Sequence, residues 1–133
     1  MGLDMSLVKR QKIKSNIDPK FVDTEEVAYW RKANAIHNWF VVNLIDTVDN
    51  CKLSTVTYDD LIKLKTTCEK VLKNKNDTEY ILKNLPPVGG FFFGSTDIDE
   101  NYIYDVETTI KHIDKILNEL DFESYDLFYE PWW

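Results

Sequence analysis

The sequence predicts an α+β fold in which a small antiparallel sheet packs against three to four helices. Three patterns predict it: alternating apolar residues near the N-terminus, helical periodicity with capping signals in the middle, and a strand-like aromatic segment near the end. The chain has 133 residues, 44% hydrophobic and 14% aromatic. It is therefore expected to form one domain, residues 1–133, with a substantial core.

The residue pattern of the N-terminal third predicts a strand followed by a long helix. Apolar residues at positions 3, 5 and 7 alternate with polar ones, as in a half-buried strand. Asp23 and Glu26 have the spacing of a capping box, which predicts a helix over residues 24–45. At 100° per residue, the core face of this helix would carry Tyr29, Ala33, Ile36, Phe40 and Leu44.

Two further helices are expected after a loop over residues 46–54. The first spans residues 58–73, with Thr57 as its N-cap. Its inward face would carry Leu61, Leu64, Cys68, Val71 and Leu72. The second spans residues 78–84 and ends before Pro86, because proline lacks the amide donor and restricts the preceding residue.

The C-terminal third predicts a short buried strand, a helix and a final strand. Residues 88–93 are expected to form the short strand and residues 125–129 the final one. Between them, Asp97 and Glu100 have capping-box spacing and open a helix over residues 98–120. The buried stripe of this helix would comprise Tyr102, Val106, Thr109, Ile113, Ile116, Leu117 and Leu120.

The net charge of −7 is distributed unevenly along the chain. Residues 1–20 hold five cations and two anions, a net charge of +3, whereas residues 85–133 hold two cations and eleven anions, a net charge of −9. An acidic surface repels phosphate backbones, so we expect no nucleic-acid binding. The asymmetry could drive self-association or capture of a basic protein, or the basic strand could simply lie beside acidic helices.

The composition of the chain also indicates the cellular compartment in which the protein is expected. No apolar run is long enough to span a bilayer, and the N-terminus lacks the apolar region of a secretory signal. The only cysteines, Cys51 and Cys68, are too few for a disulfide framework, and Cys68 falls on an apolar helical face. We expect a protein of the reducing cytosol, without membrane association.

Two segments depart strongly from average composition: Tyr29-Trp-Arg-Lys-Ala-Asn-Ala-Ile-His-Asn-Trp-Phe-Val41 and Gly90-Phe-Phe-Phe-Gly-Ser-Thr-Asp97. With Met1-Gly-Leu-Asp-Met5 and a terminal aromatic strand, they resemble, in the same order, a family of small bacteriophage and prophage proteins of uncharacterised function. The chain departs from that family at Ser6 and at Glu130-Pro131. The resemblance implies a phage origin, the cytosol of a host bacterium and a shared fold, but no reaction.

The first of these segments carries the main binding candidates: Trp30, Arg31, Asn34 and His37. An indole can stack on a planar ring, the Asn amide is a paired donor and acceptor, and the guanidinium fork matches phosphate or carboxylate. A nucleotide-like ligand needs these groups. The alternative is that Trp30 and His37 are core-edge residues satisfied by neighbouring backbone.

The second segment carries Phe92, Ser95 and Thr96. Phe92 should point opposite to its neighbours in a strand, toward a ligand cavity or a partner subunit. The hydroxyls of Ser95 and Thr96 lie at an expected helix N-terminus and could hold an anion, although Asp97 beside them equally suits ordinary capping. The acids and histidines lack metal-ligand spacing, so no metal and no cofactor are expected.

Three functions remain open. The preferred one is a phage accessory protein, acting in host takeover or against host defence, that sequesters a small anionic nucleotide-like ligand without catalysis. The alternatives are a protein–protein inhibitor that binds a basic host factor through the acidic residues 85–133, and a small nucleotide hydrolase that uses His37. A homodimer or higher homo-oligomer is also expected, because aromatic side chains gather at the chain end: Phe128, Tyr129, Trp132 and Trp133.

Overall fold

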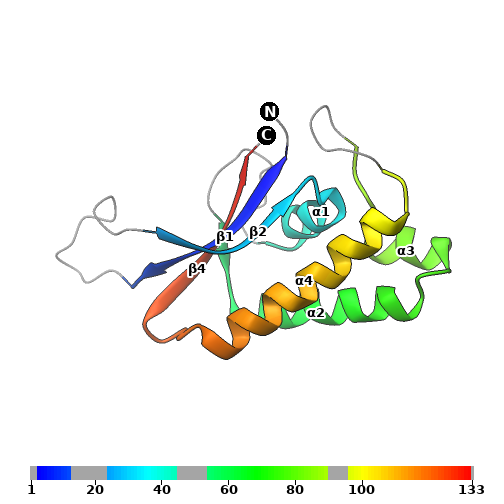
Figure 1. Ribbon diagram of the computed structural model, residues 1–133. Helices are drawn as coiled ribbons and strands as arrows, with labels where there is room; N and C mark the ends of the chain where they lie inside the picture. Colours follow the sequence, from blue (N-terminus) through cyan, green and yellow to red (C-terminus); the bar gives the residue numbers. More distant parts are fainter. Residues whose placement is uncertain (1–2, 13–23, 45–53, 90–95, 133) are drawn as a thin grey trace.

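The computed structural model describes residues 3–12, 24–44, 54–89 and 96–132, and it has the expected α+β fold (Figure 1). In chain order its elements are β1 (Asp4–Gln11), β2 (Thr24–Arg31), α1 (Asn34–Asn43), β3 (Ser54–Val56), α2 (Tyr58–Lys73), α3 (Thr78–Asn84), α4 (Glu100–Glu119) and β4 (Tyr125–Trp132). The four strands form an antiparallel sheet in the order β2-β1-β4-β3.

The two central strands come from opposite ends of the described chain. β1 pairs with β4 over its full length, and Leu7 lies opposite Tyr129. The alternation expected for the N-terminal strand is confirmed, since Leu3, Met5 and Leu7 are fully buried. Leu127 and Tyr129 continue the same buried face across β4. Figure 1 shows the helices gathered to one side of this sheet.

Helix α2 has the bounds that its sequence predicts, with Thr57 as its N-cap. The Thr57 hydroxyl accepts a hydrogen bond from the Asp60 amide at 3.1 Å, and the Asp60 carboxylate accepts one from the Thr57 amide at 2.9 Å. This capping box satisfies two amides that the helix cannot pair internally. Burial raises the pKa of the Cys68 thiol on the inward face to about 12, so this cysteine acts as a small apolar residue.

Helix α4 packs along α2 and begins slightly later than its sequence pattern indicates. Its N-cap is Asp99, whose carboxylate accepts hydrogen bonds from the amides of Asn101 and Tyr102, whereas the sequence had suggested Asp97. The expected buried stripe is confirmed at five positions and is only half-buried at Leu117 and Leu120; the buried members are Tyr102, Val106, Thr109, Ile113 and Ile116.

The expectation of one helix over residues 24–45 is wrong. Residues 24–31 form strand β2, and helix α1 starts only at Asn34. Ala28 and Trp30 are buried while Tyr29 between them is 44% exposed, which is the period of a strand. The local sequence fits both periods, and pairing with β1 at seven residue pairs decides the outcome.

The expected third strand is also placed differently. Val88 and Gly89 are not in a strand, and residues 90–93 lie outside the described part. The sheet is completed instead by β2 at one edge and by the three-residue strand β3 at the other. Ser54, assigned to a loop from the sequence, belongs to β3, which pairs with β4 because Val56 reaches the buried face opposite Leu127.

Candidate functional site

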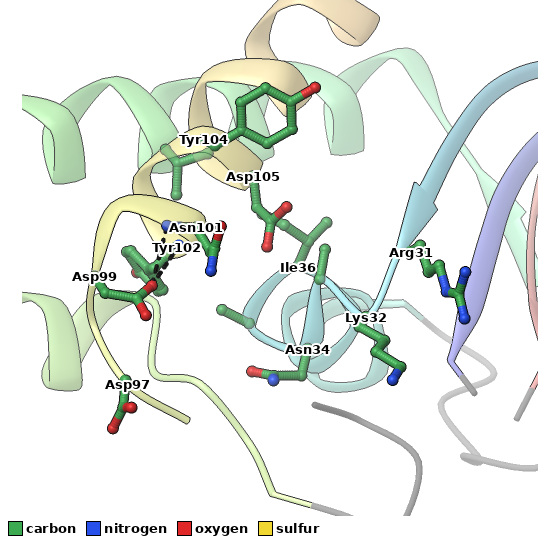
Figure 2. A pocket seen from close by; sticks show the side chains of 13 residues that line it. Arg31, Lys32, Asn34, Ile36, Asp97, Asp99, Asn101, Tyr102, Tyr104 and Asp105 are labelled. Carbon is green, nitrogen blue, oxygen red and sulfur yellow. Dashed lines mark hydrogen bonds between the residues drawn. The ribbon is translucent and has the colours of Figure 1, made fainter. Parts of the chain in front are cut away.

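One pocket is lined by residues 31–36 of the first unusual sequence segment and by Asp97, the last residue of the second. The pocket lies between the β2–α1 turn and the N-terminal part of α4, and it has a volume of about 270 Å³ (Figure 2). This is close to the lower end of the roughly 300–1,000 Å³ typical of small-molecule sites. Its lining residues are Arg31, Lys32, Ala33, Asn34, Ala35, Ile36, Asp97, Asp99, Asn101, Tyr102, Tyr104, Asp105 and Val106.

The β2–α1 turn is built around a residue in an unusual backbone conformation. Lys32 has a φ of 54°, the only positive φ of a described non-glycine residue. Its amide donates to the Leu3 carbonyl at 2.6 Å, and its own carbonyl accepts from the Asn34 amide at 2.9 Å. A side chain in the left-handed region costs about 1–2 kcal/mol. Such strain clusters at functional sites, and here it places a lysine at the pocket wall.

Asn34 fixes the start of α1 to the segment that follows Pro87. Its side chain is 4% exposed, and its Oδ1 accepts a hydrogen bond from the Val88 amide at 3.1 Å. The sequence predicts a role in ligand recognition for the side-chain amide of Asn34. The structure places Asn34 in the pocket lining and shows that it also has a structural role.

The opposite wall is the first two turns of α4. Asp99 holds the first turn through its two capping hydrogen bonds, at 3.0 and 3.1 Å. The Tyr102 hydroxyl donates to the Leu85 carbonyl at 2.6 Å and secures the helix against the end of α3. This wall is therefore held from two directions before any ligand binds.

Asp105 is the most unusual group in the pocket. Its carboxyl is half-buried, and it makes neither a hydrogen bond nor an ion pair with any part of the chain that the structure describes. Burial, reinforced by the negative charge of Asp99, raises the pKa of Asp105 to about 6 from an ordinary 3.8. A carboxyl kept partly from water without a protein partner is a functional-site signal, because its burial otherwise only costs stability.

Charge is divided across the pocket. Lys32 and Arg31 are exposed on the β2–α1 side, and neither forms an ion pair with another described residue. Figure 2 shows Asp105 and Asn101 projecting from α4 toward this turn, whereas Arg31 lies at the rim and points away from Asp105. The arrangement can accept hydrogen bonds at one end of a ligand and attract an anion at the other.

The structure separates the residues that the sequence had grouped. Arg31 and Asn34 line the pocket, but Trp30 and His37 do not. Thr96 is exposed and is not among the lining residues, and Phe92 and Ser95 lie outside the described part of the chain. A ligand-binding role for Trp30, His37, Phe92, Ser95 and Thr96 stays a prediction.

Trp30 and His37 are core residues with partners. Trp30 is 3% exposed, and its indole nitrogen donates to Thr109 Oγ1 at 2.9 Å. His37 is 1% exposed, and its Nδ1 lies 2.6 Å from Tyr129 Oη. The Tyr129 ring also stacks on Phe40, with centroids 4.0 Å apart. These contacts are those of the core-edge alternative, with side-chain partners in place of backbone ones.

Eleven of the thirteen lining residues were not predicted as ligand-binding from the sequence, among them Lys32, Asn101, Tyr104 and Asp105. A signal existed in the sequence for Asn101 and Asp105. Asn101 and Asp105 are four residues apart, so they lie on one border of the apolar stripe of α4 that begins at Tyr102. A pair of polar side chains beside a buried stripe marks the edge of the apolar face of a helix. The sequence does not show which other element packs against that edge.

Comparison with protein-family profiles, curated proteins and solved structures gives no match. The resemblance to phage and prophage proteins accordingly stays a prediction from the sequence motifs. Within the described ranges, no group of three or more His, Cys, Asp or Glu side chains is placed to hold a metal ion. None of the described helices is both long and apolar enough to cross a membrane.

Proposed function

We propose that this protein binds a small anionic, nucleotide-like ligand in the pocket between the β2–α1 turn and α4, without catalysis. The observation that carries the proposal is the pairing of unpartnered groups across one pocket. Lys32 offers a cation on one side, and the Asp105 carboxyl offers acceptors on the other. A nucleotide has the complementary layout, with an anionic phosphate at one end and base N–H groups at the other.

The backbone conformation supports a ligand-binding role for Lys32. The chain keeps a strained lysine at a position where glycine would be free of strain. A strained side chain is retained when it contributes something other than stability. Phosphate attraction by Lys32, with Arg31 at the rim, is such a contribution.

The biological role proposed with this binding is sequestration. The motifs resemble those of phage and prophage proteins, and a phage protein that holds a host nucleotide would remove it from host signalling. Because the pocket walls are fixed by capping and tertiary hydrogen bonds, the site is preorganised, which lowers the entropic cost of holding a ligand.

The direct test is ligand release. Purified protein is incubated with a nucleotide mixture, washed, heat-denatured, and the released compounds are identified by mass spectrometry. Release of an unaltered nucleotide is expected. Release of an altered nucleotide would contradict binding without catalysis and favour the hydrolase alternative, whereas no release would contradict the proposal and favour the protein–protein inhibitor.

Two substitutions at one position locate the site. Lys32→Gly should fold at least as well as the unaltered protein but should bind the nucleotide about tenfold more weakly, as one charge-assisted contact is lost. Lys32→Arg keeps the charge and should retain most of the affinity. The measurement is isothermal titration, with thermal unfolding as a check, since ligand at 100 times Kd stabilises by about 2.7 kcal/mol. Equal affinities of both variants would contradict this location.

A further inference from the structure

The Asp105 carboxyl restricts which nucleotide the pocket can recognise. An ionised carboxylate only accepts hydrogen bonds, and its two oxygens can take two parallel N–H donors. Asp105 projects into the pocket and makes no hydrogen bond with the described residues, so both oxygens are available for a ligand. A ligand edge with a single donor, or with an acceptor facing Asp105, would leave this half-buried group poorly satisfied.

The surroundings of Asp105 suit one edge of a planar base. Asn101, one helical turn earlier on α4, lines the same pocket, and its side-chain amide makes no hydrogen bond with another described residue. It can donate to an oxygen next to the two donors. Lys32 stands on the opposite wall.

We propose that the pocket selects guanine nucleotides, with Asp105 accepting the adjacent N1–H and N2–H groups of the base and Asn101 donating to O6. Among the common bases, only guanine has two neighbouring N–H donors beside a carbonyl oxygen. The phosphate then extends toward Lys32. This specificity rests on the proposed function, since it concerns the same pocket.

The test compares GMP with IMP and AMP by isothermal titration of the unaltered full chain. IMP differs from GMP only by the absent 2-amino group. The expected result is that GMP binds about tenfold or more tightly than IMP, because a bidentate pair is reduced to a single hydrogen bond. AMP, which presents an acceptor at N1, should bind more weakly than either.

A pair of variants assigns the preference to Asp105. Asp105→Asn should remove most of the difference between GMP and IMP, since the amide places a donor against one of the ligand's N–H groups. Glu107→Gln, an exposed residue on the same helix, makes the same change of net charge and should leave the preference intact.

The outcomes separate the two proposals. Binding of none of the three nucleotides would overturn the proposed function itself. Equal affinity for GMP and IMP in the unaltered protein would overturn guanine selection while leaving nucleotide binding in place. If Asp105→Asn weakened GMP and IMP equally, or if Glu107→Gln also removed the preference, Asp105 would not be the group that selects the base.

Discussion

The Trp30 indole nitrogen donates a hydrogen bond of 2.9 Å to Thr109 Oγ1, which joins the edge strand β2 to the middle of α4. The same hydroxyl donates at 2.7 Å to the carbonyl of Asp105, one turn earlier. The strand and the helix are therefore connected through one buried threonine, which also bonds to the backbone of Asp105 but not to its carboxyl. Because the two walls of the pocket belong to these elements, this contact holds the pocket in shape.

Removal of the Thr109 hydroxyl should destabilise the protein. Thr109→Val keeps the volume but leaves the buried indole N–H without its acceptor, at a cost of about 1–3 kcal/mol. Trp30→Ala should cost about 3–5 kcal/mol, because it also empties a large core volume. Urea denaturation of each variant measures both effects.

A double-mutant cycle with Trp30→Phe provides the control. Phenylalanine removes the donor, so Thr109→Val should cost less in that background than in the unaltered protein. Strictly additive costs would show that this hydrogen bond does not couple the strand to the helix.

Asp105→Asn should stabilise the protein at about pH 7, contrary to the usual effect of substitution. The pKa of Asp105 in the folded state, about 6, exceeds its ordinary 3.8, so the folded state holds the proton more tightly. The contribution of Asp105 to the free energy of unfolding therefore falls as pH rises from about 4 to 6 and remains low above that range. Removing the charge should recover up to about 1 kcal/mol, a value discounted for the solvent that still reaches the carboxyl.

The measurement is urea denaturation at about pH 7 and pH 5, with Glu107→Gln as the matched variant. The advantage of Asp105→Asn should shrink at the lower pH, and Glu107→Gln should show no such trend. An Asp105→Asn variant that is less stable than the unaltered protein at both pH values would contradict the raised pKa.

His112 should contribute a pH dependence of the opposite sign. Burial lowers the pKa of His112 below 6.5, although the hydrogen bond to the Tyr29 carbonyl acts in the other direction, and the Lys115 charge lowers it further. The folded state then binds fewer protons than the unfolded state, so this contribution to stability is lost as pH falls below about 6.5. The His112 ring also packs edge-on against Trp30, with centroids 5.0 Å apart.

His112→Phe keeps the ring and removes the titration. The loss of stability between about pH 7 and pH 5, measured from urea midpoints, should be smaller in this variant than in the unaltered protein. Identical slopes in the two proteins would show that the pKa of His112 does not change on folding.

Self-association is expected to depend on Trp132. Phe128 and Tyr129 are only 9% and 2% exposed, so the fold itself accounts for these two aromatics. Trp132 is 57% exposed at the end of β4, and its indole nitrogen donates to Glu130 Oε1 at 2.8 Å. A dimer that buries this ring should become monomeric in Trp132→Ser, as measured by light scattering at micromolar concentration.

Leu82→Ser is the matched control, because Leu82 is similarly exposed, at 52%, but lies on α3. It should leave the mass unchanged. A monomeric mass for the unaltered protein would contradict the prediction, and a dimer that persists in Trp132→Ser would place the interface elsewhere.

Local signals in the sequence were sufficient for much of the fold. The capping box at Thr57, the apolar stripes of α2 and α4, and the alternation at residues 3–7 each depend on neighbours close in sequence. The structure confirms them, except that the stripes are only half-buried at Leu72, Leu117 and Leu120. By contrast, residues 24–31 suit either a helix or a strand, and only their pairing with β1 decides between them. That pairing is non-local, so no short window of sequence contains it.

The candidate site was likewise predicted only in part from the sequence. The sequence marked the segment around Arg31 and Asn34 as unusual, and that segment does line the pocket. It could not show that Trp30 turns into the core or that Asp105 faces the β2–α1 turn, because both depend on how α4 packs against β2 and α1. Composition and periodicity determine which residues prefer burial. Only the tertiary structure decides which polar groups lose water without gaining a partner, since desolvation depends on segments far apart in the chain.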